Sequence, residues 1–179
     1  MSDFENNGYK VFDLFRKQWA VVAAGNMEKF NACTVSWGSL GTLWTRPGHS
    51  GSIVTVYLYP TRYTRELVAE NENFTVSFFP KDYKKALAIL GTRSGRNEDK
   101  IAVSGLTPIP VAGSVAFKEA SLTFVCRKIY QHQMTKSDLA QDIQDYYAAD
   151  PKAYPPVSGS GEWEPHWVFV GEITEVLEG

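Results

Sequence analysis

The chain has 179 residues, with 18 basic and 20 acidic side chains that give a formal net charge of −2. This length predicts a single domain, residues 1–179, whose hydrophobic core is large enough to be stable without disulfide bonds or a structural metal. The near-neutral balance argues against nucleic acid or an anionic membrane surface as the partner. The longest apolar runs fall short of the roughly 18 residues of a membrane helix, so we expect a soluble protein.

The cysteines argue for a reducing compartment. Cys33 and Cys126 lie far apart in the sequence without a C-x-x-C spacing. Residues 1–8 lack the charged segment and apolar run of a secretory signal, and the three histidines are scattered. We therefore expect a cytoplasmic protein without a zinc or iron site.

The first third of the chain has mainly strand patterns. Residues 10–25 predict two short strands, with apolar runs before and after a basic residue. Residues 31–37 alternate with a period of two, and the β-branched and aromatic run 53–59 predicts a central strand. Thr64 is then a candidate N-cap for a short helix over 65–71.

A strand and a helix follow in alternation. Residues 74–79 predict another strand, ended by a proline. Tyr83, Leu87 and Leu90 share one face of the helix after it, and Gly91 is the predicted stop.

The middle of the chain is less regular. Residues 100–105 predict a helical turn, with Asp99 or Asn97 as the cap and a glycine at the end. Pro108 and Pro110 predict an irregular crossing.

The last third returns to strands. Residues 114–134 fit two strands or one bulged strand, and 138–149 predict a helix. Residues 155–161 read as a mobile surface loop, and 166–177 predict a final strand. Six to eight strands with three short inserted helices favour a β-barrel over a βαβ sheet.

The stretch 31–47 is suited to close approach by a flat ligand. Thr34 and Ser36 place small hydroxyls on one strand face, opposite apolar side chains. Gly38 and Gly41 leave backbone N–H groups uncovered, free to donate to a ligand edge. The alternative is that the glycines form a turn or bulge and the tryptophans of this stretch belong to the core.

Two later segments carry the chemistry of a phosphate site. Residues 61–64 (T-R-Y-T) and 91–100 (G-T-R-S-G-R-N-E-D-K) combine guanidinium and ammonium groups with hydroxyls and glycine. The alternative for these arginines is simple solvation at the surface.

Seven short motifs along the chain occur in the order of one known family. They are N-x-x-T-x-S-W-G at 31–38, R-Y-T at 62–64, F-T-V-S at 74–77, G-x-x-S-G-R at 91–96, D-K-I at 99–101, S-G-L at 104–106 and H-W-V-F-V-G-E-I at 166–173. With these motifs in register, the chain resembles the flavin reductase-like family and is most similar to its flavoredoxin-like branch. The resemblance implies a mostly β fold, the FMN-binding split β-barrel of Greek-key type, with a few short peripheral helices.

The resemblance also implies a function. Members of this family bind FMN without a covalent bond, and many reduce flavin with NADH or NADPH by hydride transfer to N5. The alternative within the family is a non-enzymatic, flavoredoxin-like electron carrier that works with a protein partner. A barrel whose flavin site has decayed and a pyridoxamine-phosphate oxidase-like protein are further alternatives. A homodimer is expected.

The site residues implied by the resemblance fall into two groups and one single position. His166 matches a histidine on the nicotinamide side of the flavin, although a strand-end histidine bonded to a backbone carbonyl is an equal alternative. The implied cofactor-binding residues are Asn31, Thr34, Val35, Ser36, Trp37 and Gly38 in the first group, and Arg62, Tyr63, Thr64, Ser94, Gly95, Arg96 and Lys100 in the second, near the phosphate.

Overall fold

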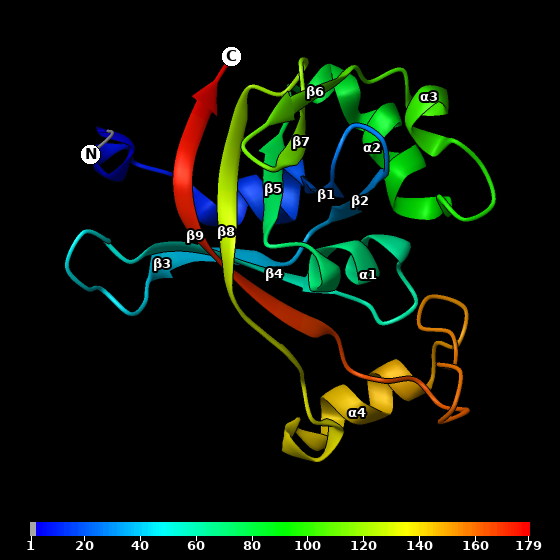
Figure 1. The fold of residues 1–179 in the computed structure, drawn as a ribbon. Helices are drawn as coiled ribbons and strands as arrows, with labels where there is room; N and C mark the ends of the chain where they lie inside the picture. The colour runs from blue at the N-terminus through cyan, green and yellow to red at the C-terminus, as the bar shows by residue number, and fades with distance from the viewer. Residues whose placement is uncertain (1–2) are drawn as a thin grey trace.

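The computed structural model describes residues 3–179, and Figure 1 shows a curved sheet with helices around it. Within these residues the nine strands are β1 (Ala20–Gly25), β2 (Phe30–Val35), β3 (Gly38–Thr42), β4 (Ser52–Leu58), β5 (Asn73–Phe78), β6 (Pro108–Val111), β7 (Ser114–Phe117), β8 (Leu122–Gln133) and β9 (Trp167–Glu178). The α-helices in the same range are α1 (Tyr63–Glu70), α2 (Lys84–Thr92), α3 (Lys100–Ser104) and α4 (Gln141–Ala148).

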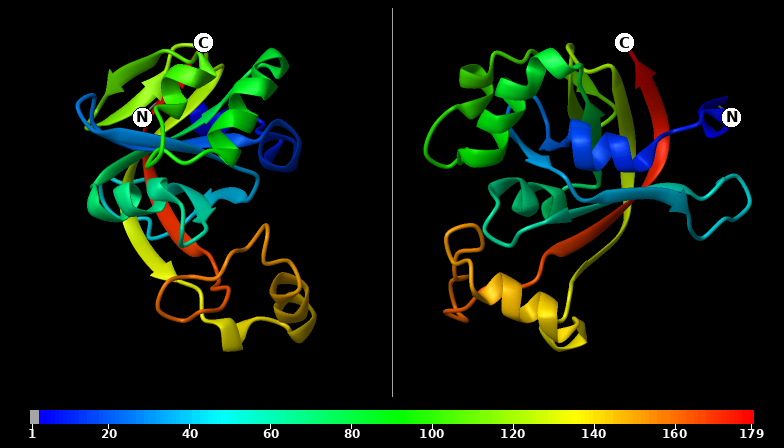
Figure 2. Two further views of the ribbon diagram at one scale, coloured as in Figure 1. Left: turned by 90° about the vertical axis from the view of Figure 1, so that its right-hand side faces the viewer. Right: turned by 180° about the vertical axis from the view of Figure 1, so that it is seen from behind.

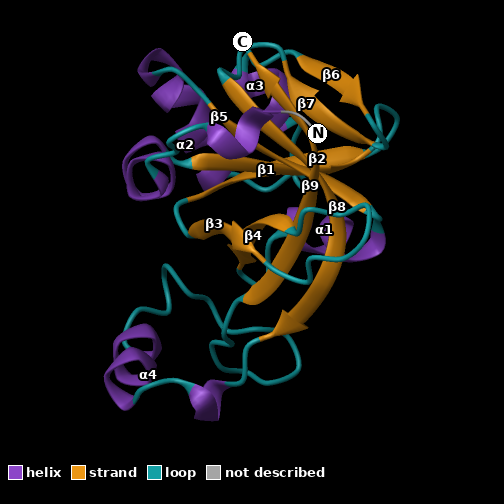
Figure 3. Cartoon of the chain, turned by 90° about the vertical axis from the view of Figure 1, so that its left-hand side faces the viewer, coloured by secondary structure: helices purple, strands orange, loops and turns teal. Residues whose placement is uncertain are grey.

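The main sheet is antiparallel and curls into a barrel that is open along one line. Its strand order is β2-β1-β5-β8-β9-β4-β3, and β6 pairs with β7 in a separate hairpin. The curling brings β2 into contact with β4, although these two strands are not hydrogen-bonded to each other. This unpaired seam splits the barrel, and the expected split-barrel fold is confirmed (Figure 3).

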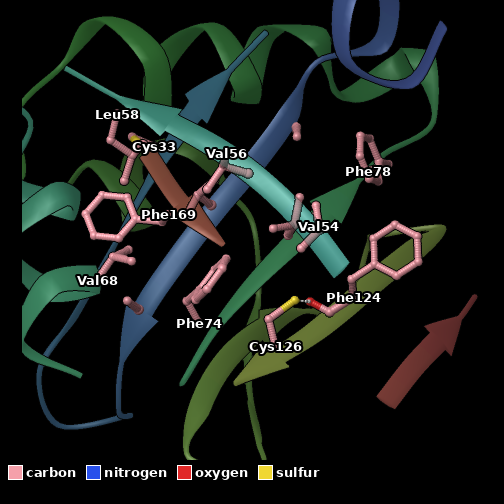
Figure 4. Packing of buried hydrophobic residues seen from close by; sticks show 14 of the residues in the cluster. Cys33, Val54, Val56, Leu58, Val68, Phe74, Phe78, Phe124, Cys126 and Phe169 are labelled. Carbon is pink, nitrogen blue, oxygen red and sulfur yellow. Dashed lines mark hydrogen bonds between the residues drawn. The ribbon is translucent and has the colours of Figure 1, made fainter. Parts of the chain in front are cut away.

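Strand β1 separates two hydrophobic clusters. Its side chains alternate, so that Val22 and Ala24 face the barrel interior while Val21 and Ala23 face α2 and α3. The strand is buried on both faces. Figure 4 shows the interior cluster, in which phenylalanines from β5, β8 and β9 fill the space between the sheet's walls.

Several expected features are confirmed. The run 53–59 forms β4, an interior strand paired with β3 on one side and β9 on the other. Asp99 caps α3 by accepting a hydrogen bond from the Ala102 N–H (3.1 Å), and Gly105 ends that helix with a φ of 74°. The segment 114–134 contains two strands, and the second of them, β8, is also bulged against β9.

The prediction of a strand before Lys17 is wrong. Residues 11–18 are helical, and the segment Asp13–Gln18 has the wide turns of a π-helix. Phe15 is buried while Phe12 is exposed, which fits a helical face. A short apolar run matches both periods, so the sequence pattern could not separate the two.

Three local predictions also need correction. Arg62, rather than Thr64, occupies the N-cap position of α1, and α2 runs through Gly91 to Thr92. Pro108 and Pro110 belong to strand β6 rather than to an irregular crossing. Prolines two residues apart lack donors on the same strand edge, so β6 can still pair with β7 through its other edge.

Strands β8 and β9 extend beyond the barrel, and the segment that joins them, residues 134–166, forms a separate structure that we call the cap. Figures 1 and 2 show both strands bending away from the sheet toward α4 and the irregular segment 149–165. The bending coincides with two register shifts, between Val125 and Cys126 and between Lys128 and Tyr130. None of the helices in residues 3–179 is long and apolar enough to cross a membrane.

We predict that Gly171→Ala destabilises the fold. A β-carbon at Gly171 would lie 2.6 Å from the Cys126 β-carbon and 2.6 Å from the Phe74 ring, both fully buried. The free energy of unfolding should fall by about 1–3 kcal/mol in chemical denaturation. Gly41→Ala in β3 is the matched control, because that position has open space. Equal stabilities of the two variants would contradict this packing.

Candidate functional site

Two adjoining cavities open at the seam of the barrel. The larger has a volume of about 660 Å³ and lies where the ends of β2 and β4 diverge. The smaller, of about 140 Å³, lies between the start of α1 and the loop after α2. Four residues line both cavities and make them continuous: Cys33, Thr61, Arg62 and Thr92.

The larger cavity is shaped by close contact between β2 and α2. The Thr34 hydroxyl donates to the Leu87 carbonyl (2.6 Å), so the predicted hydroxyl-bearing strand face meets the helix. A β-carbon at Gly91 would lie 3.3 Å from that of Thr34, which makes glycine favourable at this crossing. Helix α2 therefore forms one wall beside the end of β2.

The smaller cavity is organised by Asn31. Its side-chain amide donates to the Thr64 hydroxyl (2.8 Å), and both side chains are buried. A β-carbon at Gly95 would lie 2.3 Å from the Asn31 carboxamide oxygen, so the backbone of this loop passes directly against Asn31. One buried amide thus holds β2, α1 and the 93–96 loop around the same space.

Arg62 lies at the junction of the two cavities. It is the N-cap residue of α1, and its guanidinium donates to the Gly91 carbonyl (2.7 Å). This bond uses one of five N–H donors, and the others remain for an anion. The positive end of the α1 dipole adds to the favourable potential here.

The other predicted cations differ in their surroundings. Lys100 is buried and lines the smaller cavity, where its ammonium donates to the Leu90 and Arg93 carbonyls (2.9 and 3.1 Å). Burial lowers the pKa of Lys100, and the charge of Arg62 acts in the same direction. Arg96 lies outside both cavity linings, where it pairs with Glu66 and covers the Tyr63 ring at 5.0 Å.

His166 lies at the outer end of the larger cavity, just before β9. Its ring centroid is 4.5 Å from that of Trp37 and 5.3 Å from that of Tyr59. Burial, together with the nearby charge of Arg62, lowers the pKa of His166 from 6.5 to about 4. The imidazole is therefore neutral at pH 7. Within residues 3–179 its ring makes no hydrogen bond, so the proposed bond to a backbone carbonyl is not present.

Tyrosines close the larger cavity on the side of the cap. The Tyr59 hydroxyl donates to the Pro155 carbonyl (2.7 Å), which fixes the irregular segment against the barrel. Burial raises the pKa of Tyr59, and burial with the neighbouring Tyr147 raises that of Tyr154 to about 12. Both phenols are thus uncharged at neutral pH.

The structure brings most of the predicted site residues together. Gly38 is an exception, because it begins β3 and lies in a separate cavity, where a β-carbon would be 2.1 Å from the Phe15 ring. Arg96 is the other exception. The remaining predicted residues line the two cavities: Asn31, Thr34, Val35, Ser36, Trp37, Arg62, Tyr63, Thr64, Ser94, Gly95, Lys100 and His166.

Sequence reasoning missed several residues of the lining. Thr61, Thr92 and Arg93 lie within the segments 61–64 and 91–100 that the sequence indicates for phosphate, but the family motifs do not single them out. The cap residues Lys152 and Tyr154 lie in a segment without periodicity, and no sequence signal indicates that it returns to the barrel. The missed lining residues include Cys33, Tyr57, Tyr59, Thr61, Thr92, Arg93, Lys152 and Tyr154.

Comparison with known proteins gives one family and a set of similar folds. The family model described as "Flavin reductase like domain" matches residues 12–179. No curated protein matches the chain in sequence.

Solved structures with 20% sequence identity share the fold. Flavoredoxin from Methanosarcina acetivorans has a TM-score of 0.65 over 90% of this chain and 68% of that one. The FMN-binding protein from Thermus thermophilus with bound 1-cyclohex-2-enone has a TM-score of 0.63, covering 93% and 73%. Flavoredoxin of Desulfovibrio vulgaris (Miyazaki F) has a TM-score of 0.62, covering 97% and 74%.

We predict that His166 titrates near pH 4 in the folded protein. The unfolded chain binds this proton near pH 6.5, so His166 lowers the stability as the pH falls from 6.5 toward 4 and has no further effect below that. NMR titration of the imidazole protons, assigned with His166→Gln, measures the midpoint. A midpoint close to 6.5 would contradict the buried, neutral ring.

Proposed function

The chain belongs to the flavin reductase-like family, and we propose that it binds FMN non-covalently and reduces it with NADH or NADPH. In this proposal the protein is an oxidoreductase whose flavin accepts a hydride at N5. The flavin supplies the redox chemistry, and the protein supplies binding, orientation and shielding from water.

The main support for this proposal is the positive charge of the side chains that line the two cavities. Four cationic side chains line them, and no carboxylate does so in the part of the chain that the structure describes. An elongated ligand with an uncharged flat end and an anionic end suits such a pair of cavities. The lining cations are Arg62, Arg93, Lys100 and Lys152.

Each cavity corresponds to one part of FMN. The larger volume, about 660 Å³, lies in the range typical of cofactor sites and would hold the isoalloxazine ring between β2, β4 and the cap. The smaller cavity would hold the phosphate between Arg62, Ser94 and the backbone of the 93–96 loop.

The neutral side chains near the ring have a different task. The imidazole of His166 and the phenols of Tyr59 and Tyr154 are polar groups that carry no charge at neutral pH. They can orient a ligand and exclude water without placing a charge beside the flavin ring. This arrangement is consistent with catalysis by positioning rather than by a strong acid or base.

A second candidate is an electron carrier that holds FMN and receives electrons from a partner protein. Its support is the likeness in fold to two flavoredoxins. The two candidate functions can be distinguished by mixing the purified, FMN-loaded protein with NADH or NADPH in the absence of oxygen. Bleaching of the flavin absorbance supports the reductase, and a stable yellow spectrum supports the carrier.

We also propose a homodimer. Trp44 has an exposed fraction of 54% and Tyr130 one of 43%, and the centroids of their rings lie 6.1 Å apart. Exposed apolar side chains of this size are common where protein surfaces associate. Light scattering that gives the mass of one chain at micromolar concentration would contradict the dimer.

A cytoplasmic location completes the proposal. Cys33 and Cys126 are both free and buried. Burial raises the pKa of the Cys126 thiol well above its usual value, so this thiol stays protonated. Free thiols are the usual state in a reducing compartment.

We predict that Arg62→Gln raises the dissociation constant of FMN by about tenfold or more, because a charge-assisted hydrogen bond to the phosphate is lost. Fluorescence titration of FMN measures this constant. Arg96→Gln is the matched control, since Arg96 pairs with Glu66 outside the cavities, and its effect should be smaller. If Arg96→Gln raises the dissociation constant of FMN as much as Arg62→Gln does, the phosphate does not bind in the smaller cavity beside Arg62.

A further inference from the structure

A third cavity adjoins the proposed flavin cleft and has a different character. Its volume is about 480 Å³, which is in the range of small-molecule sites. It shares Ser36, Trp37, Tyr57, Tyr154 and His166 with the larger cofactor cavity. A molecule in this cavity would therefore lie directly beside the end of the flavin cleft.

The floor of this cavity is part of the protein core. Phe15 has an exposed fraction of 3% and packs edge-on against Phe78, with ring centroids 5.2 Å apart. Gly38 makes this position possible, because a β-carbon there would lie within 2.6 Å of three atoms of the Phe15 ring. The floor is thus a fixed aromatic surface rather than a loosely packed gap.

The opposite wall comes from the cap. In α4 no residue is buried, yet Ile143 and Tyr147 line the cavity together with Leu139, which precedes the helix. An amphipathic helix normally places its apolar face against a core. Here that face points to an open space, which leaves apolar surface for a ligand to cover.

Aromatic contacts give the cap side a defined shape. The Tyr147 ring lies 5.9 Å from Trp37, 4.4 Å from Tyr154 and 5.8 Å from Trp163, measured between centroids. Trp163 is buried, and the Lys136 ammonium lies 4.8 Å from its ring centroid. The rings form a connected cluster that spans the barrel and the cap.

The lining of this cavity does not suit a pyrophosphate group. Arg16, an exposed side chain, is the single charged residue of the lining in the described range. A pyrophosphate requires several donors or cations, and those lie in the other two cavities. The pyrophosphate of a hydride donor would therefore lie outside this cavity.

We propose that the 480 Å³ cavity binds a compact, phosphate-free aromatic molecule, the electron acceptor that is reduced beside the flavin. A quinone fits this class: it takes up two electrons and two protons to become a hydroquinone. NAD(P)H supplies one hydride, which is two electrons and one proton, and water supplies the second proton. The acceptor role rests on the proposed function, whereas binding of the aromatic molecule does not.

The test uses N-phenyl-1-naphthylamine, an uncharged aromatic probe whose fluorescence rises in apolar sites, with the full chain in the presence and absence of FMN. We expect saturable binding in both cases. Ile143→Asp, which adds a carboxylate to the cavity wall, should raise the probe's dissociation constant by about tenfold or more. Tyr146→Asp is the matched control on the same helix, because its exposed ring does not line the cavity and should leave binding within about twofold.

Three results would overturn the proposal. One is equal loss of probe binding in both variants, which indicates a general apolar surface. Another is displacement of the probe by excess NAD⁺, which assigns the cavity to the hydride donor. The third is a probe signal per chain that falls as the protein concentration rises, which indicates that a second copy fills the cavity.

Two controls separate this proposal from the proposed function. The dissociation constant of FMN should be unchanged in Ile143→Asp, because this residue does not line the flavin cleft. If wild-type protein binds the probe but never binds FMN, the proposed function fails and the aromatic site stands. Circular dichroism establishes that each variant is folded.

Discussion

The pairing of β8 with β9 is the interaction on which the rest of the structure depends. The two strands pair from the ends inside the barrel to Gln133 and Trp167 outside it. Two register shifts bend the ribbon, and Gly171 lets the Phe74 ring pack against it where the barrel ends. The inner half of this ribbon encloses the core, and the outer half carries the cap that faces the site (Figure 1).

The seam between β2 and β4 follows from the same geometry. A sheet that curls without joining its edges leaves one line where strands touch but do not share hydrogen bonds. Side chains near this line are held by α1 and α2 through single polar contacts, such as Asn31 with Thr64 and Thr34 with the Leu87 carbonyl. A ligand can enter at the seam because no ladder hydrogen bond has to break there.

The cavities along the seam divide by charge. At one end the buried Lys100 and the half-buried Arg62 donate to backbone carbonyls, and their positive charges favour an anion. At the other end Trp37, Tyr147 and Trp163 surround a space with little charge. His166 lies between the two regions as a neutral ring. This gradient suits a ligand with one anionic end and one uncharged aromatic end.

The sequence by itself determined the barrel class, most strands and the segments that meet at the site, because strand periodicity and glycine-bounded motifs are local properties. It could not decide between strand and helix over residues 11–18, since a short apolar run satisfies both periods. Tertiary structure alone decided that Arg96 faces Glu66, that Gly38 makes room for Phe15 and that 149–165 folds back over the seam. Those outcomes depend on contacts between residues far apart in the chain, which no local pattern records.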